Sequence, residues 1–224
     1  MAARTAQAAA GRHVLALQDT SELDCSACAS RTAGPGGISK HSGRGLFIHP
    51  VLAVDAHSHA CLGIAHQGAW LRDVDAQKKR DRQPTEPKES MRWLQGPQAA
   101  AQYLRQAALV TVVADRESDL YELWDRIPDV HTHLLTRARC DRPLEGGGVL
   151  CGWLAAQPAA ACDVLDVPAR PKGKAYGSKD GARTAHRAHM ELRFGRVCVL
   201  RPEGCRAKQA RITLSVVAVV AVGR

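Results

Sequence analysis

Several features are missing from this chain of 224 residues, and each absence excludes a class of protein. No stretch reaches the roughly 20 consecutive apolar residues of a membrane-spanning helix. The longest apolar run, Val216–Val222, is typical of a buried strand instead. The alanine-rich start lacks the apolar core of a secretory signal, so we interpret residues 1–12 as a tail, a linker or the end of a helix. We therefore expect a protein without a membrane span.

A second pair of closely spaced cysteines is also missing. The chain has 8 cysteines, but only Cys25 and Cys28 have the C-x-x-C spacing of zinc ligands, and a structural zinc site needs four ligands. His57 and His59 lie two positions apart without a matching carboxylate or third histidine. We expect reduced, scattered thiols, and a cysteine- and histidine-rich metal-binding module stays open as an alternative that metal analysis would test.

The composition favours a folded, basic protein. Apolar residues make up 45% of the chain, which is enough to build a core. Lysine and arginine number 31 against 22 acids, giving a net charge of +9. A basic surface suits a polyanionic partner such as nucleic acid, although it also raises solubility whatever the function.

Two short segments end a strand-forming apolar run on an aspartate. They are His-Val-Leu-Ala-Leu-Gln-Asp at 13–19 and Val-Thr-Val-Val-Ala-Asp-Arg-Glu-Ser-Asp at 110–119. If the two strands are neighbours, Asp19 and Asp115 meet at one edge of a sheet. Paired carboxylates hold Mg²⁺ or Mn²⁺ for phosphoryl transfer, because hard cations prefer oxygen ligands. The segments therefore predict metal-dependent phosphodiester chemistry on nucleic acid.

Each aspartate also has a purely structural interpretation. Asp19 could serve as a turn or capping residue after its strand, and Asp115 could cap the following helix, a role for which Asp119 competes. Glu117 and Asp119 are weaker ligand candidates, because a strand-end position points at the site more reliably than the helix beyond it.

The spacing of apolar residues predicts an α/β fold. The expected order is three strands, a helix, a strand, a helix and a strand, which is the order of a ribonuclease H-like core with a mixed sheet. The expected strands are 14–18, 45–54, 61–70, 110–114 and 131–138, and the expected loops are 20–45 and 72–87. The expected helices are 119–127 and 89–108, and the interruption near Gly96-Pro97 makes 89–108 either two helices or one kinked helix. The first three strands should form an antiparallel meander with a turn at 55–60, and 110–114 should be buried on both faces.

The composition and pattern of the sequence change after Cys140. Glycines at 146–148 and expected strands at 189–194, 196–201 and 210–222 indicate a β-rich subdomain. We expect a tail or linker at 1–12, the first part of a ribonuclease H-like core at 13–139, and an inserted β-rich subdomain at 140–224, with the core incomplete at its carboxyl end.

Four segments resemble the DDE transposases of bacterial insertion sequences, in particular the insertion-sequence-four family typified by the transposase of transposon five. They are Leu-Ala-Leu-Gln-Asp-Thr-Ser-Glu-Leu at 15–23, Gly-Arg-Gly-Leu-Phe-Ile-His-Pro-Val-Leu at 43–52, Pro-Lys-Glu-Ser-Met-Arg-Trp-Leu at 87–94 and Val-Val-Ala-Asp-Arg-Glu-Ser-Asp-Leu-Tyr-Glu-Leu at 112–123. The fourth is the most specific, and weaker similarity continues through 183–200 and 212–217.

The resemblance implies cut-and-paste DNA transposition by metal-dependent phosphodiester cleavage and strand transfer. Asp19 and Asp115 match the first two metal-binding acids, with Mg²⁺ or Mn²⁺ as the cofactor. Arg137 and Arg139 lie where the family places basic residues against the DNA backbone, and a solvated basic edge is the alternative. The implied partners are the transposon ends and target DNA, with a homodimer if the protein is complete, and the implied location is the bacterial cytoplasm at the nucleoid.

The chain departs from the family pattern at the third acid. That glutamate belongs to a Tyr, Arg, Glu and Lys signature beyond the inserted β-domain, and this sequence stops at Arg224. Glu145, Glu191 and Glu203 are not in a matching context. We therefore expect a truncated transposase fragment that is inactive alone, or a non-catalytic DNA-binding protein derived from a transposase. A second basic cluster, more flexible than specific, comprises Lys172, Lys174, Lys179, Arg183 and Arg187.

Overall fold

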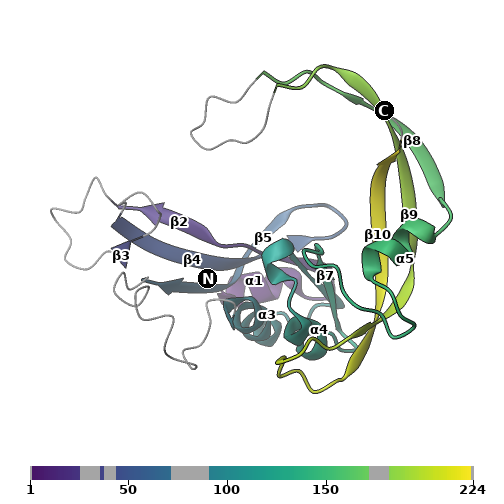
Figure 1. Cartoon of the computed structure of the whole chain (residues 1–224). Coiled ribbons are helices and arrows are strands. Elements are labelled where there is room, and N and C mark those ends of the chain that lie inside the picture. Colours follow the sequence, from purple (N-terminus) through teal and green to yellow (C-terminus); the bar gives the residue numbers. More distant parts are fainter. Residues whose placement is uncertain (1, 26–35, 38–43, 72–90, 172–181, 223–224) are drawn as a thin grey trace. The chain divides into compact units, whose positions relative to one another are not determined.

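The computed structural model describes residues 2–25, 36–37, 44–71, 91–171 and 182–222, and the chain divides into two compact units (Figure 1). Unit 1 comprises Met1–Cys140 and Glu203–Lys208, and unit 2 comprises Asp141–Pro202 and Gln209–Arg224. No sequence pattern indicated that Glu203–Lys208 returns to unit 1. Its Lys208 N–H donates to the Asp125 carboxylate at 2.8 Å. Among the described residues, no helix is both long and apolar enough to cross a membrane.

Unit 1 is built on a seven-stranded mixed sheet. The main path runs β2-β4-β1-β6-β7, and both β3 and β5 pair with β4. β1 is antiparallel to β4 and parallel to β6, and β6 is parallel to β7. The strands are β1 His13–Gln18, β2 Ser21–Asp24, β3 Gly36–Gly37, β4 Arg44–Asp55, β5 Cys61–Trp70, β6 Leu109–Ala114 and β7 Thr132–Thr136.

The predicted meander is confirmed. β4 and β5 form an antiparallel hairpin whose turn is held by Asp55, because its carboxylate accepts the N–H groups of His57 and Ser58 at 2.8 Å each. Arg12 also donates to the Asp55 carboxylate, at 2.6 Å. These hydrogen bonds hold the pKa of the Asp55 carboxyl well below its usual range. The predicted loop at 20–45, in contrast, contains two further strands, β2 and β3.

Helices cover one face of this sheet. α3 Arg92–Tyr103 lies between α1 Ala2–Ala9 and α4 Tyr121–Arg126 and contacts both (Figure 1). The apolar core lies between these helices and the alternate residues of β1 and β6 that face them, such as Val14 and Val112. The other residues of β6 are only half-buried, so the prediction of burial on both faces was wrong for the part of the chain described.

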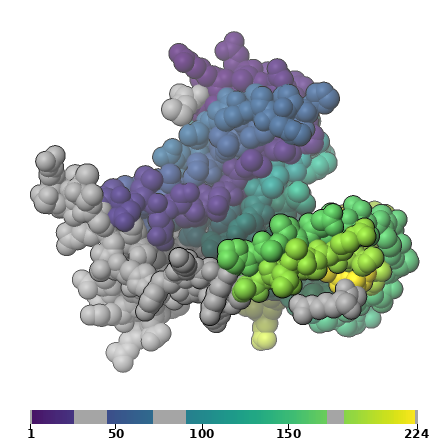
Figure 2. Space-filling model, turned by 90° about the horizontal axis from the view of Figure 1, so that it is seen from above, coloured from purple at the N-terminus to yellow at the C-terminus, as the bar shows by residue number. Residues whose placement is uncertain are grey.

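The amino-terminal residues belong to the core. Residues 2–9 form α1, which packs on β5 and buries Thr5 and Ala9. The purple amino-terminal part of the chain lies against the blue β4–β5 part in Figure 2. The Thr5 hydroxyl donates to the Ile64 carbonyl at 3.1 Å, which joins the helix to the strand. Of the alternatives given for residues 1–12, the helix agrees with α1. Its packing was not predicted, because an alanine-rich helix has little apolar periodicity.

α3 is a single helix with Pro97 inside it, so of the two alternatives predicted at Gly96-Pro97, the division into two helices was wrong. Pro97 has no N–H to donate to the Trp93 carbonyl one turn earlier. The Gln18 side chain of β1 donates to that carbonyl instead, at 3.4 Å. Gly96 allows the close approach, since a Cβ there would lie 3.2 Å from Val51 Cγ2. A tertiary contact therefore replaces the missing helical hydrogen bond.

Unit 2 is a three-stranded antiparallel sheet in the order β10-β9-β8, with one short helix. The elements are α5 Leu150–Ala156, β8 Ala161–Val167, β9 His186–Leu200 and β10 Arg211–Val222. The two strands predicted at 189–194 and 196–201 are one continuous strand, β9. Gly195 remains in the ladder opposite Val216, and a Cβ there would lie 2.5 Å from the ring of Trp153 in α5. The glycine makes room for the helix and does not end the strand.

Candidate active site at the carboxyl end of the parallel strands

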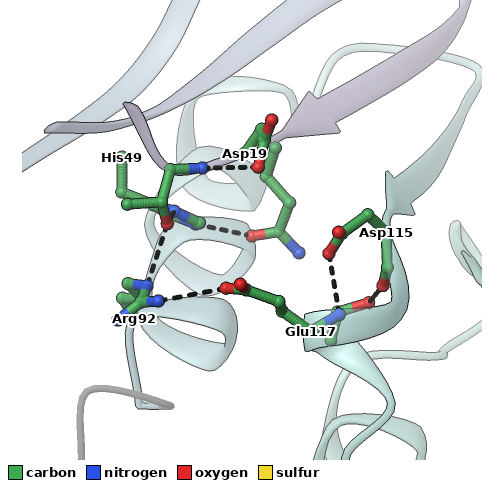
Figure 3. Close-up of polar contacts among 8 residues, drawn as sticks. Asp19, His49, Arg92, Asp115 and Glu117 are labelled. Carbon is green, nitrogen blue, oxygen red and sulfur yellow. Dashed lines mark hydrogen bonds and ion pairs between the residues drawn. The ribbon is translucent and has the colours of Figure 1, made fainter. Parts of the chain in front are cut away.

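Asp19 and Asp115 are neighbours at one edge of the sheet. β1 and β6 are parallel, and their last pair is Gln18 and Ala114. Asp19 directly follows Gln18, and Asp115 directly follows Ala114. Both side chains are exposed at this edge, and both are drawn in Figure 3. The sequence expectation that residues 19 and 115 meet at adjoining strand ends therefore agrees with the observed register.

Each aspartate also has a local structural role. The Asp19 carboxylate accepts the Thr20 N–H at 2.7 Å. Asp115 is the N-cap of a short 3₁₀ helix, Arg116–Ser118, and its carboxylate accepts the Glu117 N–H at 2.7 Å. A carboxylate has about four acceptor positions, so one local hydrogen bond leaves capacity for a cation. The structural and metal-binding interpretations are thus compatible at both positions.

The residues of this site that could hold a divalent cation are the two aspartates. Asp19 and Asp115 supply oxygen ligands of the kind that Mg²⁺ and Mn²⁺ prefer. Among the described residues, however, no three His, Cys, Asp or Glu side chains are grouped closely enough to hold a metal ion. Glu117 is near the pair, but its carboxylate is bound by the Arg92 guanidinium at 3.3 Å. A two-metal centre would need a ligand that this part of the chain does not supply.

A series of hydrogen bonds next to Asp19 connects Gln18 to Arg92 (Figure 3). The Gln18 amide oxygen can only accept, so His49 Nε2, 3.1 Å away, must donate to it. His49 Nδ1 is then the acceptor for the Thr20 hydroxyl at 2.9 Å. The Thr20 oxygen in turn accepts Nε–H of Arg92 at 2.9 Å. In this arrangement the imidazole is neutral, with a proton on Nε2 and a lone pair on Nδ1.

The surroundings of His49 favour that neutral form. The side chain is 1% exposed and lies edge-on to the Trp93 ring, with centroids 4.7 Å apart. Burial, assisted by the positive charge of Arg92, lowers the pKa of His49 to about 4. The negative charge of Asp19 opposes this effect but is too weak to reverse it. His49 is therefore a hydrogen-bonding element of the site near neutral pH and not a cation.

Arg92 connects the two aspartate-bearing segments. Its guanidinium carbon lies 5.1 Å from the centroid of Trp70 and 5.9 Å from that of Trp93, so the cation is stacked on aromatic rings. It donates to Thr20, beside Asp19, and to Glu117, beyond Asp115. Arg92 thereby ties the end of β1 to the 3₁₀ helix that follows β6.

Arg137 and Arg139 follow the next parallel strand. β7 pairs with β6, and the Arg137 N–H donates to the Ala114 carbonyl, one residue before Asp115. Both arginine side chains are exposed. Asp119, which is buried, accepts the N–H groups of Arg139 and Cys140 at 2.7 and 2.8 Å. Asp119 is thus a structural residue that holds the arginine-bearing segment, and it does not cap the helix.

Residues that the sequence analysis did not single out complete the site. These are Gln18, Thr20, His49, Arg92 and Trp93, and each lies within one of the first three segments that carry the transposase resemblance. The fourth segment contributes Asp115 and Glu117. Their position within these segments was therefore the one sequence feature that could have identified them. The sequence alone did not indicate which residues of the segments contact each other.

The other sequence candidates have partners or positions of their own. Glu191 forms an ion pair with Arg193, and Glu145 forms one with Arg211, all in unit 2. His57 and His59 lie in the turn between β4 and β5. None of the seven described cysteines forms a disulfide. Of the features singled out in the sequence, Cys28, the polar segment 72–87, and Lys172, Lys174 and Lys179 lie outside the described residues. No protein-family model matches the chain.

Proposed function

We propose that this protein binds DNA through the ribonuclease H-like core of a DDE transposase of the insertion-sequence-four family, with Asp19 and Asp115 holding one Mg²⁺ or Mn²⁺ ion. The observation that carries the proposal is the parallel register of β1 and β6, with Gln18 opposite Ala114. In this register, the strand ends that are followed by Asp19 and Asp115 are neighbours. β7, which is followed by Arg137, pairs with the other side of β6.

Two further observations support the proposal. The strands predicted from the sequence are ordered β5-β4-β1-β6-β7 with β4 antiparallel to its neighbours, the arrangement expected of a ribonuclease H-like core. In addition, the four segments that resemble the family are far apart in the sequence, yet each contributes to the Asp19–Asp115 site or the hydrogen bonds beside it. A chance resemblance gives no reason for the segments to converge.

The chemistry of the site follows from its residues. A bound divalent cation would supply Lewis-acid polarisation of a phosphodiester. Asp19 and Asp115 would ligate it, Arg92 keeps their two segments at a fixed separation, and Arg137 and Arg139 would contact phosphates without reading bases. Because Glu117 is bound to Arg92 and the described residues supply no third ligand, we expect a transposase fragment that binds DNA without cleaving it. The same observation favours the second candidate function, a non-catalytic DNA-binding protein derived from a transposase.

The metal proposal predicts weak binding of a single Mn²⁺ ion, with a dissociation constant on the order of millimolar because only two carboxylates contribute. Asp19→Asn and Asp115→Asn should each weaken binding by about tenfold or more, measured by electron paramagnetic resonance of free Mn²⁺. Asp163→Asn, which removes an exposed carboxylate from unit 2, is the matched control. Equal loss in the control, or no loss in either site variant, would contradict the assignment.

The DNA proposal predicts salt-dependent affinity for duplex DNA without sequence preference. Replacing both Arg137 and Arg139 with glutamine should weaken binding by about tenfold at low salt and reduce the slope of log K against log salt by about two. Fluorescence anisotropy of a labelled duplex in chelator measures both quantities.

A control variant removes the same charge elsewhere in unit 1. Arg4 in α1 and Arg105, at the opposite end of β6 from Asp115, are both exposed. Glutamine at these two positions should leave affinity nearly unchanged. If this control loses as much affinity as the Arg137 and Arg139 variant, the attraction comes from net charge alone and the proposed surface is wrong. Nuclease assays with Mn²⁺ separate binding from cleavage, and we expect binding alone.

A further inference from the structure

Strand pairing is interrupted at Asp19. β1 and β2 pair with β4 in one antiparallel register, and the pairs on either side of the interruption are Gln18–Val51 and Ser21–Ile48. Continued across the interruption, this register places Pro50 opposite Asp19 and His49 opposite Thr20. A proline has no N–H to donate to a neighbouring strand. The pairing of β1 with β6 also ends at Gln18, so within the described part of the chain no strand pairing holds the backbone of Asp19.

Side-chain hydrogen bonds hold this segment instead. The Thr20 hydroxyl donates to Nδ1 of His49, the residue opposite, at 2.9 Å. Nε2 of the same imidazole donates to the Gln18 amide oxygen at 3.1 Å. The imidazole is buried, so water does not compete with either hydrogen bond. A single side chain of β4 therefore binds both the residue before Asp19 and the residue after it.

Both of these neighbours are also bound to the same turn of α3. The Gln18 amide nitrogen donates to the Trp93 carbonyl at 3.4 Å, and Nε of Arg92 donates to the Thr20 oxygen at 2.9 Å. Arg92 and Trp93 are consecutive residues at the start of α3, and Trp93 belongs to the buried interior of unit 1. The two sides of Asp19 are thus fixed to one turn of a packed helix.

The Asp19 side chain itself is oriented by these anchored neighbours. Gln18 is buried and contacts α3, Asp19 is exposed, and Thr20 contacts α3 again, which is the alternation of an extended segment. The N–H that the Asp19 carboxylate accepts, at 2.7 Å, belongs to Thr20. An exposed aspartate without such a bond exchanges among about three rotamers. Fixing Thr20 therefore fixes the carboxylate.

We propose that His49 and Thr20 are positioning residues, which hold the Asp19 carboxylate in a single rotamer beside Asp115 before a cation binds. Neither residue is a ligand in this arrangement. The consequence for metal affinity rests on the proposed function, whereas the orientation of Asp19 is a property of the metal-free protein. Ligands that are ordered in advance bind more tightly, because binding does not have to order them.

The first test measures the rotamer of Asp19 in the metal-free, full-length protein. Vicinal NMR couplings of Asp19 Cγ to its own amide nitrogen and carbonyl carbon should show one rotamer in the wild type. Thr20→Val removes the hydroxyl and His49→Gln disrupts both bonds of the imidazole, so both variants should show averaged couplings. Thr20→Ser keeps a hydroxyl and should retain the single rotamer. Averaged couplings in the wild type or in Thr20→Ser, or a single rotamer in folded Thr20→Val or His49→Gln, would overturn the proposal.

Thr5→Val is the matched control. It makes the same substitution at another hydroxyl of unit 1, which donates to the Ile64 carbonyl and joins α1 to β5. The control also loses a hydrogen bond, but the couplings of Asp19 should remain those of the wild type. Averaged couplings in folded Thr5→Val would show that any destabilisation of unit 1 releases Asp19, and the specific role of Thr20 and His49 would be wrong.

The second test measures Mn²⁺ affinity by electron paramagnetic resonance of free Mn²⁺. Thr20→Val and His49→Gln should raise the dissociation constant by about threefold to tenfold, less than Asp19→Asn, because the ligand is present but must be ordered on binding. Thr20→Ser and Thr5→Val should match the wild type. The two readouts distinguish the proposals. A single Asp19 rotamer without Mn²⁺ binding contradicts the metal site and supports the positioning, whereas averaged couplings with unchanged Mn²⁺ affinity overturn the positioning role and leave the metal site intact.

Discussion

Acidification from pH 6.5 to pH 4 should cost this protein about 3 kcal/mol of stability through His49 alone. The pKa of His49 is lowered from 6.5 to about 4 by burial and by the charge of Arg92. As the pH falls below 6.5, the unfolded chain binds a proton at His49 and the folded chain does not. The stabilisation is complete above pH 6.5, is lost progressively on the way down, and is gone below about pH 4.

Denaturant unfolding at a series of pH values measures this loss. His49→Gln should be less stable than the wild type near neutral pH, because it disrupts the bonds to Gln18 and Thr20, and its stability should change much less between pH 6.5 and pH 4. The exposed histidine His57 provides the control, because His57→Gln removes an imidazole outside the network and should keep the wild-type loss. Wild-type stability that stays flat over this range would mean that His49 is charged or open to water in the folded protein.

The Asp55 carboxylate contributes at a different pH. Its pKa is lowered by the N–H groups of Ser58 and His57 and by Arg12, so its stabilisation is lost only as the pH falls below the ordinary range of an aspartate. Loss of stability above pH 4 that His49→Gln abolishes therefore reports on His49. Further loss at lower pH reports on Asp55 together with the other carboxyls whose pKa values are lowered, Glu122, Asp129 and Glu145.

The sequence predicted the parts of the fold that depend on local pattern. Strands such as β5 and β6 have runs of β-branched and apolar residues bounded by turn residues, and their predicted bounds differ from the observed ones by at most one residue. The adjacency of Asp19 and Asp115 followed from strand order, because parallel strands end at a common edge. Local pattern and topology were sufficient for these features.

Tertiary contacts decided the features that the sequence did not predict. Pro97 looked like a helix break, and the Gln18 side chain, far away in the sequence, compensates for it. Gly195 looked like a strand end, and the Trp153 ring explains it. The partners of Arg92 could not be deduced either, since Thr20 and Glu117 lie on opposite sides of it in the sequence. In each case, the residue that explains the local exception belongs to another element.

The docking of α1 on β5 leads to the second large expected effect. Gly63 of β5 has φ +130°, which side-chain-bearing residues rarely adopt, and a Cβ there would lie 2.5 Å from Thr5 Oγ1 in α1. Gly63→Ala should therefore destabilise the protein by roughly 2 to 4 kcal/mol, from backbone strain together with overpacking. Chemical denaturation at neutral pH measures the loss.

Two further variants separate the causes. Gly68→Ala in the same strand meets only the His49 carbonyl at 4.0 Å, an ordinary contact, and should cost much less than Gly63→Ala. Adding Thr5→Ala to Gly63→Ala removes the obstructing hydroxyl, so the double variant should recover part of the stability although Thr5→Ala alone loses the bond to Ile64. Simple additivity of the two substitutions would mean that α1 does not lie against Gly63. Recovery would establish that the amino-terminal helix is part of the folded core, because a tail in solvent could neither obstruct the new methyl group nor relieve its strain.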